Sequence, residues 1–374
     1  MEDHNSARQL ALDLIYLVRC AVDHELPERA RIDALNLKSL FTLAEGQSMI
    51  AVAAYALEAA GVHSEDFTEA WGKALRKAIL LDQDFRLLTR QLDAAGIWYM
   101  PLKGAVLKDY YPRLGMRQMS DYDILYDERY ANQVKKIMLA MGYSVDEFNM
   151  HNVDSYEKPP VYRFELHRKL FSPYLDDQLY AYYRDVKDSL IKDEGGTCGY
   201  HFRPEDFYLY LIAHEYKHYM TGGNGLRFLM DTYVYLRKFD SLLDHSYLEE
   251  ELGKLGLQDF EYKNRLLTAN LFDGAELTPE ETGMLDYMLS SGTFGTVDQA
   301  VHNQIERLGG GSRGKWRFIR QRLLIPMKTV ESAYPFFYRH KLLIPFLYPY
   351  RLWKGIFRSR EKILAEFRAL RHKE

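Results

Sequence analysis

The stretch Pro101–Asp127 reads PLKGAVLKDYYPRLGMRQMSDYDILYD, and the predicted fold is organised around it. It continues a short apolar run, Ile97–Leu102, that is typical of a strand. A Lys-Gly turn follows at Lys103-Gly104, and Ala105–Tyr111 is predicted to be helical. The pattern therefore predicts a strand, a tight turn and a short helix, followed after a loop by a second strand.

The second strand begins with two carboxylates, Asp121 and Asp123. Because side chains alternate along a strand, these two point to one face, and Tyr122 and Ile124 point to the other. Two neighbouring carboxylates repel each other unless a cation lies between them, and hard oxygen ligands of this kind suit Mg²⁺. The segment therefore predicts a magnesium site.

The turn Lys103-Gly104 predicts a contact with phosphate, because free backbone N–H groups and the helix dipole both favour an anion at the start of a helix. Taken alone, an Asp-x-Asp pair or a Lys-Gly turn is common at ordinary strand ends and turns. Their combination in this order, with Arg117 and Ser120 between them, is far more restrictive.

The segments Leu102-Lys103-Gly104 and Arg117–Asp123 (RQMSDYD) resemble the nucleotidyltransferase superfamily with the DNA polymerase β-like fold. The closest resemblance is to a largely uncharacterised bacterial nucleotidyltransferase family with the pattern LKG…R-x-M-S-D-x-D. The resemblance implies an α+β fold, in which a small mixed β-sheet nucleotidyltransferase core carries an N-terminal helical subdomain and a C-terminal helical domain.

The resemblance also implies the residues of the site. Asp121, Asp123 and Glu165 would be catalytic and would bind Mg²⁺ or Mn²⁺, with ATP or another NTP as the substrate. The residues implied in nucleotide binding are Lys103, Gly104, Arg117, Ser120, Lys217 and His218. The chain departs from the superfamily in one motif: Lys103-Gly104 stands where Gly-Ser or Gly-Gly is usual, and the spacing to Asp121 is longer than usual.

Glu165 belongs to a predicted strand, Val161–His167, on which Arg163, Glu165 and His167 share one face. A single glutamate on a strand is usually an exposed partner of a lysine. The apolar neighbours of Glu165, and its position after the Asp pair, favour the catalytic interpretation. The lone histidine, His167, is expected to orient Glu165, with a contact to substrate or metal as the alternative.

The rest of the chain is predicted to be mainly helical, since apolar residues recur at helical spacing. Predicted helices are Asn5–Val22, Asn36–Ala60, Ser64–Gly96, Glu128–Met141, Gln178–Leu190, Glu205–Tyr219, Leu226–Phe239, Tyr247–Leu255, Phe260–Phe272 and Pro279–Leu289. A strand is predicted at Tyr143–Phe148 and a polar loop at His151–Pro160. Arg227 and Asp231 are expected to pair on a helix surface.

Four regions are predicted: an N-terminal helical subdomain (1–96) that packs on the sheet, a catalytic core (97–200), a helical domain (201–311) and a basic tail (312–374). A glycine-rich break at Gly309–Gly314 is the expected hinge into the tail.

The segment His214-Glu215-Tyr216-Lys217-His218 formally matches the HExxH zinc motif, which places two histidines one helical turn apart with glutamate as the base. No third ligand follows in the expected spacing, and Phe207 and Leu211 align with the histidines as if that face were packed. A zinc peptidase is therefore the least favoured function. The same helix resembles the H-x-x-K-H helix of the nucleotidyltransferase family, where it would face the nucleotide.

Composition and charge limit the class of protein. The two cysteines, Cys20 and Cys198, have no metal-type spacing, and the acidic N-terminus differs from a secretory leader, so a cytoplasmic location is expected. No apolar run is long enough for a transmembrane segment.

The tail after Gly311 is strongly basic. It holds 16 Lys/Arg and 4 Asp/Glu, a net charge of +12, whereas the whole chain carries −4. Aromatic residues lie among these cations, as in surfaces that meet RNA or membranes. We expect a flap that closes over the acidic body, with RNA and a membrane surface as the alternatives.

The predicted activity is transfer of a nucleoside monophosphate from an NTP to a hydroxyl on an RNA end, a protein side chain or a small molecule. The alternative is a non-catalytic module that binds nucleotide or RNA on the same scaffold. The three carboxylates favour the enzyme.

Overall fold

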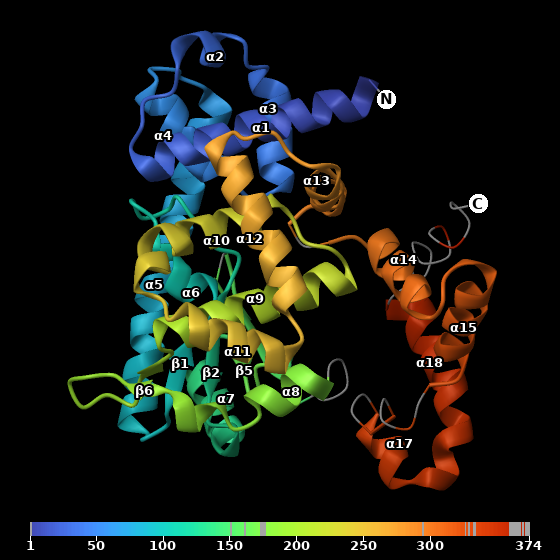
Figure 1. Ribbon diagram of the computed structural model, residues 1–374. Coiled ribbons are helices and arrows are strands. Elements are labelled where there is room, and N and C mark those ends of the chain that lie inside the picture. The colour runs from blue at the N-terminus through green and yellow to red at the C-terminus, as the bar shows by residue number, and fades with distance from the viewer. Residues whose placement is uncertain are drawn as a thin grey trace.

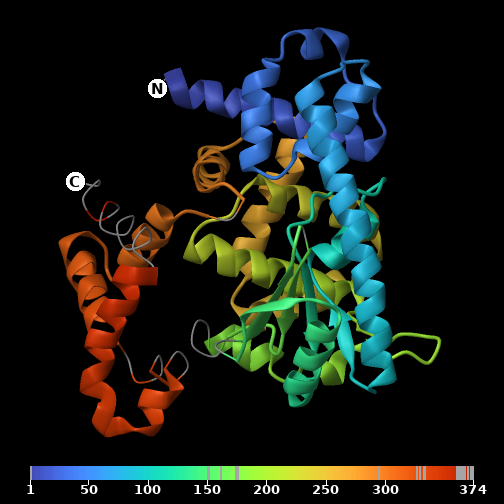
Figure 2. The same cartoon turned by 180° about the vertical axis from the view of Figure 1, so that it is seen from behind.

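The computed structural model describes residues 2–149, 152–160, 162–172, 177–293, 295–325 and 334–358, and residues 327, 330, 331, 368 and 370. Helices surround one five-stranded sheet to form a body, and a group of C-terminal helices stands beside it (Figures 1 and 2). The predicted α+β class is confirmed. Among the described residues, no helix has both the length and the apolar character needed to cross a membrane.

The sheet is mixed, as predicted. Its strands are β1 (Tyr99–Pro101), β2 (Tyr122–Tyr126), β3 (Ser144–Glu147), β4 (Val153–Lys158) and β5 (Tyr162–His167). They lie in the order β1-β2-β5-β4-β3, with β2 and β5 parallel and the other neighbours antiparallel. A separate two-stranded ribbon pairs β6 (Ile191–Lys192) with β7 (Tyr200–His201).

Two helices, α5 (Glu65–Ala94) and α7 (Ala131–Ala140), cover one face of the sheet. Tyr122, Ile124 and Phe164 pack against them and are almost fully buried. Since side chains alternate along each strand, Asp123 and Glu165 must point to the opposite face. The hydrophobic packing of one face therefore sets the direction of the carboxylates on the other.

The polar loop predicted at His151–Pro160 is wrong, because most of it is strand β4, which pairs with β5 along its whole length. The polar residues of β4 obscured the alternation of apolar and polar residues that is typical of a strand. Tyr156 and Asp154 point into the core with no exposed surface, and the Asp154 carboxylate accepts hydrogen bonds from the Tyr126 hydroxyl and the Asn149 N–H. His151 itself and Val161, the predicted start of the next strand, lie outside the described residues.

The N-terminal helices are α1 (Glu2–Asp23), α2 (Arg29–Asp33), α3 (Leu37–Gly46) and α4 (Ile50–Ala59). The single helix predicted over Asn36–Ala60 is therefore broken. At the break Ser48 has a positive φ of 54°, and the Gln47 side chain accepts a hydrogen bond from the Leu226 N–H. The break connects these helices to the C-terminal half of the body.

Helices α8 to α13 complete the body: α8 (Asp177–Tyr183), α9 (Pro204–Thr221), α10 (Leu226–Phe239), α11 (His245–Leu255), α12 (Gln258–Asp273) and α13 (Pro279–Ser291). All lie where helices were predicted, although α8 ends at Tyr183 and continues as a 3-10 turn, Val186–Ser189. One hydrophobic core joins α1 and α4 to α10, α12 and α13. The N-terminal region therefore packs on the sheet through α5, whereas α1 and α4 join the helical core.

The C-terminal lobe consists of α14 (Val297–Arg307), α15 (Gly311–Leu323), α17 (Pro335–Arg339) and α18 (Ile344–Arg358). Helix α14 was not predicted, and α15 begins inside the glycine-rich segment that was predicted to be a break. The chain does turn there, at three glycines with positive φ, Gly309, Gly310 and Gly311.

Candidate active site

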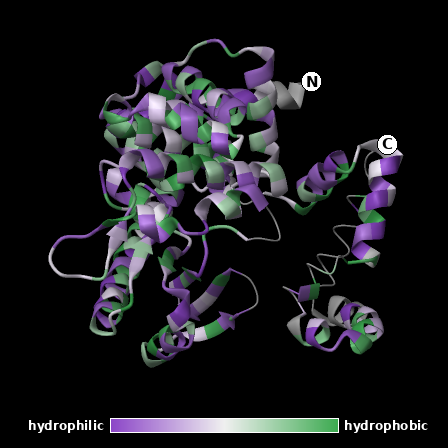
Figure 3. Ribbon diagram, turned by 60° about the horizontal axis from the view of Figure 1, so that its bottom comes forward, coloured by the Kyte–Doolittle hydropathy of each residue, from purple (hydrophilic) through white to green (hydrophobic). Residues whose placement is uncertain are grey.

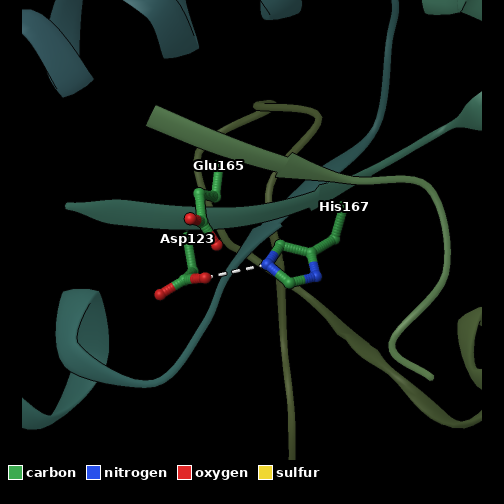
Figure 4. Close-up of side chains that lie close together, drawn as sticks. All are labelled: Asp123, Glu165 and His167. Carbon is green, nitrogen blue, oxygen red and sulfur yellow. Dashed lines mark hydrogen bonds and ion pairs between the residues drawn. The ribbon is translucent and has the colours of Figure 1, made fainter. Parts of the chain in front are cut away.

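The parallel pairing of β2 and β5 brings the carboxylates together. Asp123 lies beside Glu165 in the register, and Leu125 lies beside His167. One potential ligand atom from each of Asp123, Glu165 and His167 lies within 4.8 Å of the others (Figure 4). Among the described residues this is the only such group of three or more acidic, histidine or cysteine side chains. It contains two of the three predicted metal ligands.

Asp123 is buried and already has two partners. Its Oδ1 accepts hydrogen bonds from Lys103 Nζ at 2.7 Å and from His167 Nε2 at 2.8 Å. Burial alone would raise the pKa of Asp123, but the Lys103 ammonium and the His167 ring outweigh it and hold that pKa well below its usual range. Two protein side chains therefore contact Asp123 in addition to any bound metal ion.

His167 orients Asp123 and not Glu165, contrary to the sequence-based expectation. Burial and the nearby Lys103 ammonium lower the pKa of His167, so the ring is neutral and its Nε2–H is the donor to Asp123. Its Nδ1 is buried without a hydrogen-bond partner among the described residues. Because the ring nitrogen that faces the carboxylates is the protonated Nε2, which donates to Asp123, this geometry favours a positioning role.

Glu165 and Asp121 carry negative charge that nearby cations balance only in part. Burial, and then the charge of Asp123, raises the pKa of both groups. The cation nearest to Glu165 is Arg163, whose Nη2 lies 3.6 Å from the carboxylate. Crowded carboxylates with raised pKa values fit the binding of a divalent cation, which would relieve their repulsion.

Asp121 directly precedes β2. A helix outside the sheet holds the loop before Asp121 in place. Ser120 Oγ donates to Asp121 Oδ1 at 2.9 Å. Lys77, on α5, donates from Nζ to the Ser120 carbonyl at 2.7 Å. Sequence reasoning missed Lys77, because a lysine on an amphipathic helix carries no signal for a contact 43 residues away.

The Lys103-Gly104 turn differs from the predicted phosphate site in one respect. The helix that it starts, α6 (Gly104–Leu107), has only four residues, and its Ala105 and Val106 N–H groups bond to the Leu102 and Lys103 carbonyls. Few backbone donors and little helix dipole therefore remain for an anion. The Lys103 ammonium is the main positive charge of the turn.

Gly104 is required by its neighbour Arg117. A Cβ atom at Gly104 would lie 2.2 Å from Arg117 Nη1. The guanidinium of Arg117 is buried and binds Asp231 through two hydrogen bonds of 2.8 Å, and the Tyr111 hydroxyl donates to the same carboxylate at 2.6 Å. In this conformation Arg117 clamps the turn to α10; its contact with nucleotide stays a prediction.

Asp231 does not form the predicted surface pair with Arg227. Both residues lie on the inner side of α10 and are less than a tenth exposed. Arg227 donates instead to the Gln118 carbonyl at 2.6 Å. Helix α10 is thus turned so that its charged residues hold the loop that leads to Asp121.

Helix α9 faces the carboxylates from across the cavity. His214 Nε2 and His218 Nε2 lie 3.1 Å apart. Burial, and then nearby lysines, lowers the pKa of His218 to about 3 and that of His214 well below its usual value, so both rings are neutral. Burial lowers the pKa of Lys217 to about 8, although Asp123 and Glu165 oppose this shift.

Glu215 points away from the histidines into the helical core. It has no exposed surface, and its carboxylate accepts hydrogen bonds from Asn264 Nδ2, Asn224 Nδ2 and Thr232 Oγ1. Burial raises its pKa to about 8. A zinc peptidase needs this glutamate beside the metal-bound water, and the geometry is incompatible with that role.

We therefore predict that the His214/His218 pair carries no stoichiometric zinc. The measurement is elemental analysis of protein purified without added metal, compared with His218→Ala. Zinc bound in equal amount to the protein, and lost in the variant, would contradict the prediction.

One cavity collects nearly all the predicted residues. Its lining includes Lys103, Gly104, Arg117, Ser120, Asp121, Asp123, Glu165 and His218. Lys217 lines the neighbouring cavity, between α9 and Arg307 of α14. Phe228 and Thr293 also line the first cavity and carried no signal in the sequence, because each is an ordinary residue on an ordinary helix or loop.

Comparison with known proteins agrees with this arrangement. The model of a family described as uncharacterised nucleotidyltransferase matches residues 33–273, which is more than half of the chain. The chain therefore belongs to this uncharacterised nucleotidyltransferase family. A search of curated proteins and a search of solved structures found no match.

Proposed function

We propose that the protein is a metal-dependent nucleotidyltransferase, which moves a nucleoside monophosphate from ATP or another NTP to a hydroxyl acceptor. The observation that carries the proposal is the side-by-side placement of Asp123 and Glu165 on parallel strands, in a cavity shared with Asp121 and Lys103. Family membership supports the same class.

In this proposal Asp121, Asp123 and Glu165 hold Mg²⁺ or Mn²⁺. The ion, when bound, supplies Lewis-acid stabilisation of the charge on the triphosphate. His167 keeps Asp123 in place through its 2.8 Å hydrogen bond. Lys103 exchanges its contact with Asp123 for a phosphate oxygen, which places its ammonium beside the leaving pyrophosphate.

Glu165 accepts the proton of the acceptor hydroxyl in this scheme. Its side chain lines the same cavity as Asp121 and Asp123, where a bound acceptor would lie. The acceptor oxygen forms a bond with the α-phosphorus, the bond between the α- and β-phosphates breaks, and pyrophosphate leaves. The expected products are a nucleotidylated acceptor and an equal amount of pyrophosphate.

The test uses NTPs labelled at the α-phosphate, with Mg²⁺ and a cell extract as the source of acceptor. We expect label on an acceptor and pyrophosphate release, both lost in Glu165→Gln. Failure of all four NTPs to give a product, while calorimetry still detects binding of Mg-ATP, would favour the non-catalytic module. One observation supports that alternative: Lys103 already compensates the charge of Asp123, and His167 already donates a hydrogen bond to it.

The proposed nucleotide contact of Lys217 predicts a pH dependence. The free protein holds Lys217 with a pKa of about 8, so its ammonium is lost above that pH. The Kd for Mg-ATP should then rise by up to about tenfold per pH unit above pH 8, because binding must take up a proton. Calorimetry at several pH values measures this. Lys217→Arg, which stays charged, should remove the dependence; an unchanged pH profile in that variant would refute the contact.

A further inference from the structure

The C-terminal lobe exposes an unusual amount of hydrophobic surface. Of the twenty large hydrophobic side chains that are exposed among the described residues, ten lie after Gly311. The six most exposed of these are Trp316, Leu324, Phe336, Leu342, Phe346 and Trp353, between 57% and 94% exposed. Large hydrophobic side chains exposed in this number mark a surface that binds something.

Among the described residues, the core of the lobe is small. Its cluster of buried hydrophobic residues consists of Val301 and Ile305 on α14 and Phe318 on α15, and Val330 and Leu347 are buried as well. In Figures 1 and 2, α15, α17 and α18 stand to one side of the body, and α14 connects them to it. The expected flap over the body is therefore absent from the described part of the lobe, where Trp316, Phe336, Phe346 and Trp353 stay exposed.

Charge and apolar character occur together on the lobe. The segment after Gly311 has a net charge of +12. Figure 3 shows hydrophobic and hydrophilic residues mixed along its helices. On α18, Phe346, Tyr350 and Trp353 follow helical spacing and are all exposed, while Leu347 between them is buried. Lys341 and Arg339, just before α18, are exposed as well.

We propose that the C-terminal lobe docks on an anionic lipid membrane surface. Such a surface satisfies both features: its head groups attract Lys and Arg, and its acyl boundary accepts Leu, Phe and Trp. The lobe would lie on the membrane and would not cross it. This inference does not depend on the proposed nucleotidyl transfer.

Other occupants fit less well. Nucleic-acid bases stack on aromatic rings, but the most exposed side chain of the lobe is the aliphatic Leu342, at 94%. A second copy of the lobe would bring two strongly basic surfaces together. The acidic body offers the opposite charge. Its exposed hydrophobic residues, however, are scattered over separate elements; for example, Leu87 lies on α5 and Leu139 on α7.

The experiment is co-sedimentation of the full chain with vesicles of equal parts phosphatidylcholine and phosphatidylglycerol, with pure phosphatidylcholine vesicles as the reference. We expect binding to the anionic vesicles only. Leu342→Ser with Phe346→Ser, and separately Arg313→Glu with Arg320→Glu, should each lower the partition coefficient by about tenfold or more. The control is Leu26→Ser with Leu242→Ser, two body leucines that are 76% and 70% exposed, which should bind as wild type.

Three outcomes would overturn the proposal. The first is equal sedimentation of the Leu342/Phe346 variant and the wild type with anionic vesicles. The second is absence of vesicle binding by the full chain, together with tight binding of a fluorescent single-stranded RNA that the Arg313/Arg320 variant loses. The third is a dimer in sedimentation velocity that the Leu342/Phe346 variant dissociates, with no vesicle binding.

Discussion

Replacing Asp123 by asparagine is expected to reduce nucleotidyl transfer by about a thousandfold. The amide keeps the shape of the side chain but loses the negative charge that the proposed ion needs, and several kcal/mol of transition-state stabilisation depend on that ion. Because Asp123 also pairs with Lys103 and His167, the variant should melt at a lower temperature than the wild type. Transfer of labelled nucleotide and a thermal melt together measure both effects.

The matched control is Asp127→Asn, directly after the same strand. Asp127 is also buried and also bound to a cation, Arg129, but it lies outside the cavity. It should keep wild-type turnover. A folded Asp123→Asn protein with more than a small fraction of wild-type activity would rule out the proposed metal role.

Replacing Asp231 by alanine is expected to lower the free energy of unfolding by about 3–5 kcal/mol, since it leaves the buried Arg117 guanidinium without its partner. The Tyr111 hydroxyl loses its acceptor in the same step. Urea unfolding followed by circular dichroism gives the free energy, provided that the transition is two-state.

Two further variants test whether the lost stability of Asp231→Ala comes from the Arg117–Asp231 clamp or from the loss of any charged residue. Asp33→Ala breaks an exposed pair with Arg29 on α2 and should cost less than about 1 kcal/mol. The double variant Arg117→Met with Asp231→Leu should be more stable than Asp231→Ala, because no unpaired charge remains buried. A loss below about 1 kcal/mol in Asp231→Ala would show that the pair contributes little.

The parts of the site that sequence reasoning predicted are those governed by local geometry. Alternation along a strand is enough to place Asp123 opposite Tyr122 and Ile124, and to place Glu165 opposite Phe164. Helices such as α10 were predicted to the residue, because their apolar spacing is regular. That Asp123 lies beside Glu165 requires the parallel pairing of β2 and β5, which was not predicted; the family resemblance implied only that the two residues share a site.

The parts that could not be predicted depend on contacts between distant residues. Nothing local shows that Lys103 turns onto Asp123, or that Arg117 binds a carboxylate 114 residues away. Strand β4 was not predicted because its sequence is polar. One of its polar residues, Asp154, nevertheless lies in the core, where it is hydrogen-bonded to Tyr126. The exposed lobe was not predicted either. A high density of aromatic residues indicates that another surface covers them, but it does not show which surface that is.

The Arg117–Asp231 clamp also sets an order of assembly on the ribosome. The strands that carry Asp123 and Glu165 are synthesised well before α10, so a nascent chain that has reached β5 holds an unpaired guanidinium beside the Lys103-Gly104 turn. The loop before Asp121 must also wait for Arg227 of α10. The candidate site thus forms late in translation. A fragment that stops after residue 200 would contain Asp121, Asp123 and Glu165 but would lack the contacts of α10 that hold the loop before them.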